Sequence, residues 1–194
     1  MVNIHAADAP TSAWVRRFLP LIAPGGRVLD LAAGEGRHTR LLLDRGFRVV
    51  AADRKRAEPF AATPHCERIE IDLESGEPWR LGGGFDGIVV SLYLHRPLFV
   101  DLVASLAPGG VLIYETFMRG NERLGRPTNP DFLLKPNELF ETFSRDLRVV
   151  AFEQGEVAEP KPAMMQRIAA VKGDMPRVPE GNAKTPRREG FPPI

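Results

Sequence analysis

The sequence predicts an α/β protein in which helices cover both faces of a mostly parallel sheet. Strand-like and helix-like segments alternate from residue 10 to about residue 172, and this alternation is typical of parallel strands joined by crossover helices. The last two strand-like segments have no helical pattern between them. We therefore expect them to form an antiparallel hairpin at one edge of the sheet.

The individual elements follow from apolar patterns and from the turn residues that bound them. Thr11 or Ser12 is a suitable N-cap for the first helix, Gly46 is a suitable end for the second, and Pro97 suits the first turn of the third. Helices are expected at 11–19, 37–45, 97–106 and 136–143. Strands are expected at 27–31, 47–53, 68–72, 85–94, 111–116, 148–153 and 164–171.

Composition limits the class of protein. With 194 residues, 43% of them hydrophobic, the chain can bury one sizeable core. Its 26 basic and 25 acidic residues nearly balance, which argues against a nucleic-acid binder. A single cysteine, Cys66, excludes internal disulfides and fits a reducing compartment. The first ten residues do not resemble a signal peptide and no apolar run is long enough for a membrane span, so we expect a cytoplasmic protein without a membrane partner.

The domain is expected to cover residues 1–172. Residues 173–194 are rich in glycine and proline and show no apolar periodicity. Such a segment buries too little apolar surface to offset its ordering entropy. We therefore predict a C-terminal tail outside the domain.

A glycine loop follows the first strand and opens the second helix. It contains Asp30, Ala32, Gly34 and Gly36, and its glycines allow a backbone to approach a ligand next to free helix N–H groups. It is not a dinucleotide fingerprint, because Thr39 occupies the third glycine position. A carboxylate this close would repel a pyrophosphate, but it suits a ligand with ammonium and sulfonium charges. The loop therefore points to S-adenosylmethionine.

Two further acidic residues end strands where such a ligand needs them. Asp53 ends the second predicted strand and could accept both ribose hydroxyls, as the equivalent acid does in dinucleotide folds. Asp72 ends the third and could accept a hydrogen bond from the adenine amino group, with Leu73 packing on the ring. The succession of these acids after three strands makes the set specific.

Five segments together resemble the class I S-adenosylmethionine-dependent methyltransferases: VLDLAAGEG (28–36), VVAAD (49–53), IEIDLES (69–75), FDGIVVSLYLH (85–95) and LAPGGVLIYETF (106–117). Within this class the chain looks most like the small bacterial methyltransferases grouped with tellurite-resistance proteins. The resemblance implies a Rossmann-like three-layer α/β/α fold with seven strands in the order 3-2-1-4-5-7-6, strand 7 being antiparallel. It also implies S-adenosylmethionine as methyl donor and S-adenosylhomocysteine as product.

In the family's topology the methyl group faces the ends of strands four and five. Ser91 ends the core of the fourth strand and is a candidate cofactor contact. Tyr93, His95 and Arg96 follow it and are the catalytic candidates. His95 could remove a proton from an oxygen or nitrogen nucleophile near neutral pH, although a histidine that bonds loop backbone is the equal alternative.

Arg96 precedes a proline at an expected helix N-terminus, where the helix dipole disfavours a cation. Some anion should therefore compensate it, and Glu115, Asp131 or part of a substrate are the candidates. The fifth strand leads into residues 118–135, which have no regular pattern and a small excess of positive charge. Long loops of this kind often form lids or binding loops. This one would suit an anionic small molecule, and a solvated flap is the equal alternative.

The predicted function is methyl transfer from S-adenosylmethionine to a small-molecule acceptor by in-line displacement. Two alternatives remain open: a non-catalytic S-adenosylmethionine-binding sensor or assembly module, and an NAD-dependent oxidoreductase. No metal site is expected, since Cys66 and the neighbouring His65 have no further ligands nearby in the sequence. His38, just after the glycine loop, is expected at the surface.

Overall fold

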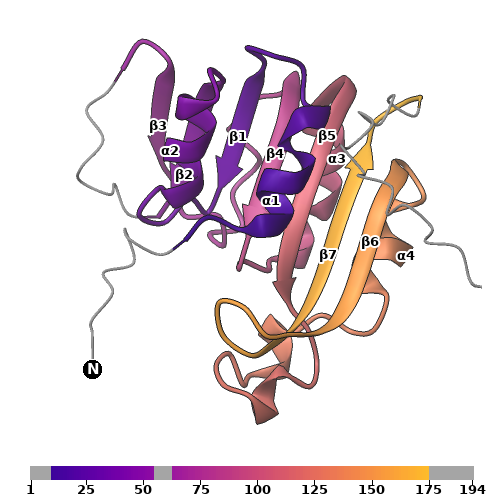
Figure 1. Cartoon of the computed structure of the whole chain (residues 1–194). Coiled ribbons are helices and arrows are strands. Elements are labelled where there is room, and N and C mark those ends of the chain that lie inside the picture. Colours follow the sequence, from indigo (N-terminus) through magenta and orange to yellow (C-terminus); the bar gives the residue numbers. More distant parts are fainter. Residues whose placement is uncertain (1–9, 55–62, 175–194) are drawn as a thin grey trace, which may run out of the picture.

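The computed structural model describes residues 10–54 and 63–174, which form one seven-stranded sheet (Figure 1). The strand order is β3-β2-β1-β4-β5-β7-β6. Strands β1 to β5 are all parallel to one another, and β7 runs antiparallel to both β5 and β6. The strands are β1 (Arg27–Leu31), β2 (Arg48–Asp53), β3 (Cys66–Glu70), β4 (Phe85–Ser91), β5 (Leu106–Phe117), β6 (Arg148–Val157) and β7 (Ala163–Val171). The predicted fold, strand order and edge hairpin are confirmed.

Helices pack on both faces of the sheet, which gives three layers (Figure 1). Val28 of β1 shares an apolar cluster with Trp14, whereas the next residue, Leu29, shares another with Phe99 and Phe143. None of the helices in the described ranges has the length and apolar character to span a membrane. The first face carries α1 (Ala13–Phe18) and α2 (Arg37–Asp44), and the second carries α3 (Phe99–Ser105) and α4 (Glu138–Phe143).

Short 3-10 helices complete the connections. They are η2 (Leu19–Leu21), η3 (Arg96–Leu98), η4 (Asn121–Arg123) and η5 (Pro130–Phe132). The last two lie within the segment 118–135, which was predicted to be irregular. A bridge between Met118 and Leu134 closes the base of that segment, so it forms a compact loop beyond the end of β5.

Two predicted helix ends are confirmed. The Ser12 hydroxyl accepts a hydrogen bond from the Val15 amide at 3.2 Å, which caps α1. Gly46 adopts the left-handed conformation, with a φ of 80°, just after α2, and its amide donates to the Leu43 carbonyl at 2.9 Å.

Some boundaries differ from the prediction. Strand β3 ends at Glu70, two residues before the predicted end, because only Cys66 of this edge strand is buried and the apolar pattern is weak. Strand β5 starts at Leu106 rather than residue 111, and a register shift in its pairing with β4 accommodates the extra length. The predicted tail at 173–194 falls, from residue 175 on, outside the described residues.

Candidate active site

The glycine loop leaves β1 in a sequence of left-handed conformations. Ala32 and Gly34 both have a φ of 55°, and Gly36 has a φ of 75° before α2 begins at Arg37. A left-handed conformation costs a residue such as alanine about 1–3 kcal/mol and is often found at ligand sites. A Cβ added at Gly34 would meet nothing within 4 Å. The loop therefore presents bare backbone to open space.

Asp53 lies against this loop. Its Oδ2 accepts a hydrogen bond from the Gly34 amide at 2.8 Å. The carboxylate stands at the carboxyl end of β2, which is paired with β1, and it is only half-buried. It therefore lies beside the exposed loop at the edge where these strands end.

Asp72 and Leu73 lie beyond the end of β3. The Ile71 amide donates to the Asp53 carbonyl at 2.9 Å, which keeps this segment next to β2. Asp72 is exposed and accepts the Glu74 amide at 2.9 Å, and half-buried Leu73 packs against the core. The structure thus brings both residues to the same edge as Asp53, although Asp72 follows the strand rather than ending it.

Asp30 faces α2 rather than open space. It is 2% exposed, and its Oδ2 accepts the Thr39 hydroxyl at 2.6 Å. Burial raises the pKa of this carboxyl to about 6, against the effect of the Thr39 hydrogen bonds and nearby Arg37. Asp30 therefore holds the start of α2 to β1. The hydrogen-bond partner of Asp30 is Thr39, the residue that occupies the position of the third glycine of the dinucleotide motif.

His38 is buried, so the expectation of a surface position was wrong. Its Nε2 accepts the Ser12 amide at 3.1 Å. Burial, together with the charges of Arg37 and Arg16, lowers the pKa of the imidazole to about 3. A neutral His38 thereby fastens the start of α1 to α2.

Tyr93 lies on the same side as the acidic residues that are predicted to bind the cofactor. Its backbone carbonyl accepts the Tyr114 hydroxyl at 2.9 Å. Its own hydroxyl is buried and lies close to the Glu74 carboxylate. Burial raises the pKa of this phenol, and the interaction with Glu74 and the charges of Asp72 and Asp53 raise it further.

Arg96 is committed to partners inside the protein. Its guanidinium forms an ion pair with Glu138, with Nη2 and Oε2 3.0 Å apart, and donates to the carbonyls of Asp131 and Leu133. The internal anion expected from the sequence exists, but it is Glu138 rather than the carboxylate of Glu115 or Asp131. Because its donors are used in this way, Arg96 fastens the loop 118–135 to the end of β4.

His95 precedes η3 and is half-buried. Its carbonyl accepts the Leu98 amide at 3.2 Å. Within the described residues, the imidazole forms no hydrogen bond. His95 therefore lies just beyond the end of β4, and none of the described residues orients its imidazole as a base.

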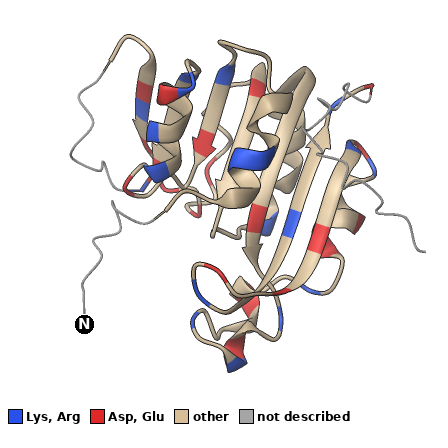
Figure 2. Cartoon of the chain, in the orientation of Figure 1, with Lys and Arg blue, Asp and Glu red and all other residues tan. Residues whose placement is uncertain are grey.

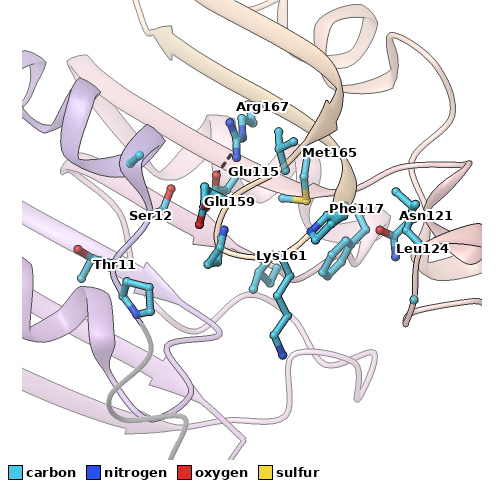
Figure 3. A pocket seen from close by; sticks show the side chains of 18 of the residues that line it. Thr11, Ser12, Glu115, Phe117, Asn121, Leu124, Glu159, Lys161, Met165 and Arg167 are labelled. Carbon is cyan, nitrogen blue, oxygen red and sulfur yellow. Dashed lines mark ion pairs between the residues drawn. The ribbon is translucent and has the colours of Figure 1, made fainter. Parts of the chain in front are cut away.

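A cavity of about 830 Å³ opens beyond the carboxyl ends of β4 and β5 (Figure 3). Its walls come from the start of α1, the loop 118–135 and the turn between β6 and β7, and include Phe117, Leu124 and Met165. Two carboxylates, Glu115 and Glu159, also line it. Within the described residues it is lined by five cationic side chains, those of Arg16, Arg37, Arg126, Lys161 and Arg167.

The sequence predicted the loop 118–135 as a candidate lid or binding loop but did not indicate the other two segments that line the cavity. Residues 10–13 and 157–163 reach the cavity only because the sheet brings them together. No local pattern in either segment signals this. Tyr93, His95 and Arg96 are not among the lining residues, so the structure does not bring the three catalytic candidates into this cavity.

A chain of polar contacts connects the glycine loop to the cavity. Arg37, the first residue of α2, donates to the Ser91 hydroxyl at 3.0 Å. Ser91 in turn donates to Glu115 Oε1 at 3.1 Å. Glu115 Oε2 lies 3.3 Å from Arg167 Nε, and Figure 2 shows such an acidic and basic pair side by side on β5 and β7. Ser91 therefore lies between the predicted cofactor site and the cavity.

Residues 4–155 match the family described as methyltransferase domain. A protein-L-isoaspartate O-methyltransferase from Chlorobaculum tepidum is 28% identical over 123 residues, 59% of this chain. The chain spans only about half of that relative, 55% of its length.

Solved structures share the fold. TehB from Haemophilus influenzae superimposes with a TM-score of 0.66 at 19% identity, over 84% of this chain and 62% of TehB. A 1,6-didemethyltoxoflavin-N1-methyltransferase from Burkholderia thailandensis, solved with 1,6-didemethyltoxoflavin and S-adenosylhomocysteine, gives 0.59 at 20% identity, over 84% of this chain and 77% of that one. The family match covers most of the chain. The chain therefore belongs to the methyltransferase domain family. This confirms the resemblance of its sequence to the S-adenosylmethionine-dependent methyltransferases.

Proposed function

We propose that this protein transfers the methyl group of S-adenosylmethionine to a small organic molecule that carries a negative charge. The observation that carries the proposal is the apolar-walled cavity with its excess of cationic side chains, which adjoins the end of the glycine loop through Ser91. Both parts of the proposal, donor and acceptor, rest on named residues.

The residues at the strand ends fit the donor. Open space over Gly34, beside the Asp53 carboxylate, supports a ligand position at the carboxyl ends of β1 and β2. There Asp53 would hold the ribose hydroxyls, Asp72 and Leu73 the adenine, and the backbone from Ala32 to Gly36 together with Ser91 the remainder. Asp30 would act through α2, since its side chain is buried. When bound, S-adenosylmethionine supplies an electrophilic methyl group on a sulfonium.

The cavity fits the acceptor. About 830 Å³ is within the usual range of small-molecule pockets. Lys161 and Arg126 are exposed at its rim, and neither forms an ion pair with the described residues. Phe117, Leu124 and Met165 offer apolar surface for the body of the acceptor. The Burkholderia thailandensis neighbour holds a small-molecule acceptor beside S-adenosylhomocysteine, which supports the size class proposed for this site.

Arg96 is a positioning residue in this proposal, because it fixes the loop that forms one wall. Tyr93 belongs to the cofactor side, and His95 is given no catalytic role. The protein is proposed to act in the cytoplasm, consistent with its buried free Cys66.

The donor is tested by calorimetric titration with S-adenosylhomocysteine and, in parallel, with NADH. The proposal expects saturable binding of S-adenosylhomocysteine and none of NADH. Tight binding of NADH alone would refute it. Turnover separates the methyltransferase from the sensor alternative, since a sensor would bind the product yet methylate nothing.

A further inference from the structure

We propose that Glu115 accepts a proton from the methyl acceptor, so that the substrates of this site carry an N–H or O–H nucleophile. This inference rests on the methyl transfer proposed above and adds the chemical class of the reacting atom. Glu115 lies on β5, lines the cavity and is only 4% exposed.

Glu115 is a buried carboxylate. Removing a carboxylate from water costs several kcal/mol unless its surroundings compensate. Residues two positions away on a strand point to the same face, and those neighbours of Glu115 are apolar, namely Ile113 and Phe117. The other buried carboxylate among the described residues, Asp30, faces Thr39 in the protein interior. Glu115 differs because it faces a cavity.

The described residues do not fill all the hydrogen-bond acceptor positions of the Glu115 carboxylate. A carboxylate offers about four lone-pair positions. Ser91 fills one with a hydrogen bond to Oε1. Arg167 Nε lies 3.3 Å from Oε2 as an ion pair, but the contact lacks the direction of a hydrogen bond and Nε finds no other partner among the described residues. Figure 3 shows the pair at the cavity wall, so a hydrogen-bond donor on a ligand can reach the carboxylate.

Glu115 lies between the cavity and the residues that follow the glycine loop. Ser91 and Glu115 face each other in the pairing of β4 and β5. Arg37, which bonds Ser91, directly follows the last glycine of the loop. An acceptor atom that contacts Glu115 therefore lies where the cavity adjoins the cofactor side. Lys161 and Arg126, which form no ion pair with the described residues, also line this cavity and would bind the anionic group of the acceptor.

The reaction is balanced in this arrangement. The nucleophile forms a bond from its nitrogen or oxygen to the methyl carbon while the carbon–sulfur bond breaks and its electron pair stays on sulfur. The proton of the nucleophile passes to Glu115, which loses it to solvent after the product leaves. General base catalysis of this kind contributes about 10²- to 10⁴-fold in rate. An acceptor with no proton on its reacting atom, such as a thioether, needs no such base.

The test uses the full chain, S-adenosylmethionine, and benzoates and naphthoates that carry a hydroxyl, amino or methylthio group. Turnover is expected with the hydroxyl or amino compounds and not with the methylthio compounds. Glu115→Gln keeps the shape and the acceptor for Ser91, so kcat should fall about 10²-fold or more. KM and the affinity for S-adenosylhomocysteine should stay within about twofold. Glu115→Asp keeps the carboxylate but shortens the side chain by one methylene, which moves the base away from the acceptor and should lower kcat about tenfold.

A matched control separates the base from a charge effect. Glu153→Gln removes a carboxylate that is also paired with an arginine, Arg17, at 3.0 Å, but on the exposed surface. This variant should retain wild-type kcat. Addition of formate should restore part of the activity of Glu115→Ala, which a purely structural role does not allow.

The inference is overturned if no hydroxyl or amino compound is methylated, if methylthio compounds alone are, or if Glu115→Gln retains kcat within about threefold. If Glu115→Gln does not fold, Glu115→Asp decides by the same criterion. The proposed function fails separately, if the wild-type chain does not bind S-adenosylhomocysteine in calorimetry. A chain that binds it but methylates only aprotic acceptors refutes the role of Glu115 alone.

Discussion

Asp53 fixes the Gly34 amide, and in the proposed function the same carboxylate also holds the ribose hydroxyls of the cofactor. Hydrogen bonds to charged groups contribute about 1.5–3 kcal/mol each, and a tenfold change in affinity corresponds to about 1.4 kcal/mol. We predict that Asp53→Ala weakens S-adenosylhomocysteine binding at least about tenfold in calorimetry. Asp44→Ala, at the exposed end of α2, should leave the affinity unchanged. Equal affinities in the two variants would remove Asp53 from the site.

His38 gives a prediction on pH. Its pKa lies near 3 in the folded protein, below the ordinary value of 6.5, so protonation favours the unfolded chain. The stability that neutral His38 contributes is present above pH 6.5 and is lost as pH falls toward 3. At about 1.4 kcal/mol per pKa unit, the loss reaches about 5 kcal/mol at most.

His38→Gln offers an amide oxygen to the Ser12 amide and does not titrate. Urea unfolding at several pH values should show the wild type losing more stability than this variant between pH 6.5 and 4. Parallel curves for the two proteins would mean that the pKa of His38 is the same in the folded and the unfolded chain.

Among the elements, the glycine loop is the most specific. Gly34→Val places a branched side chain in a left-handed conformation and in the open space where the cofactor is proposed to lie. We predict that it abolishes binding of S-adenosylhomocysteine. Gly46→Val imposes a similar strain, with a φ of 80° and equally open surroundings, but far from the site along α2. It should cost stability and keep affinity, and loss of affinity in both variants would point to general unfolding.

The loop 118–135 depends on Arg96, which bonds Glu138 and two of the loop's carbonyls. Arg96→Met should therefore speed hydrogen exchange of the Arg119 and Leu134 amides, which bond across the base of the loop, and leave cofactor affinity unchanged. Arg123→Met, an exposed arginine of the same loop, should change neither. Unaltered exchange in Arg96→Met would show that the loop holds its shape without this clamp.

At the scale of the whole molecule, the order of strands followed from the family resemblance, and the position of the proposed cofactor residues followed from the strand assignment. Parallel strands all end at one edge, so Asp53 and the glycine loop had to meet once the strands were assigned. The boundary of β3 was harder to place, because its weakly buried edge has little apolar signal. The glycines at 109 and 110 similarly hid the true start of β5.

The acceptor side could not be derived in the same way. Arg96 finds Glu138 42 residues away, and Glu115 meets Arg167 across two strands that run in opposite directions. Such pairs depend on the register of strands and on loop packing, which local patterns do not encode. His38 looked like a surface residue for the same reason, since its partner Ser12 belongs to another helix.

The central claim, methyl transfer to a small anionic molecule, is tested most directly with methyl-labelled S-adenosylmethionine and a bacterial extract. The protein and the donor are incubated with the extract, which is then separated into protein, nucleic acid, and small-molecule fractions, and the last is divided by ion exchange. We predict that label accumulates in a small-molecule fraction retained by an anion exchanger, with wild type and not with Asp53→Ala. Label that appears only in protein or nucleic acid, or only in unretained small molecules, would contradict the account.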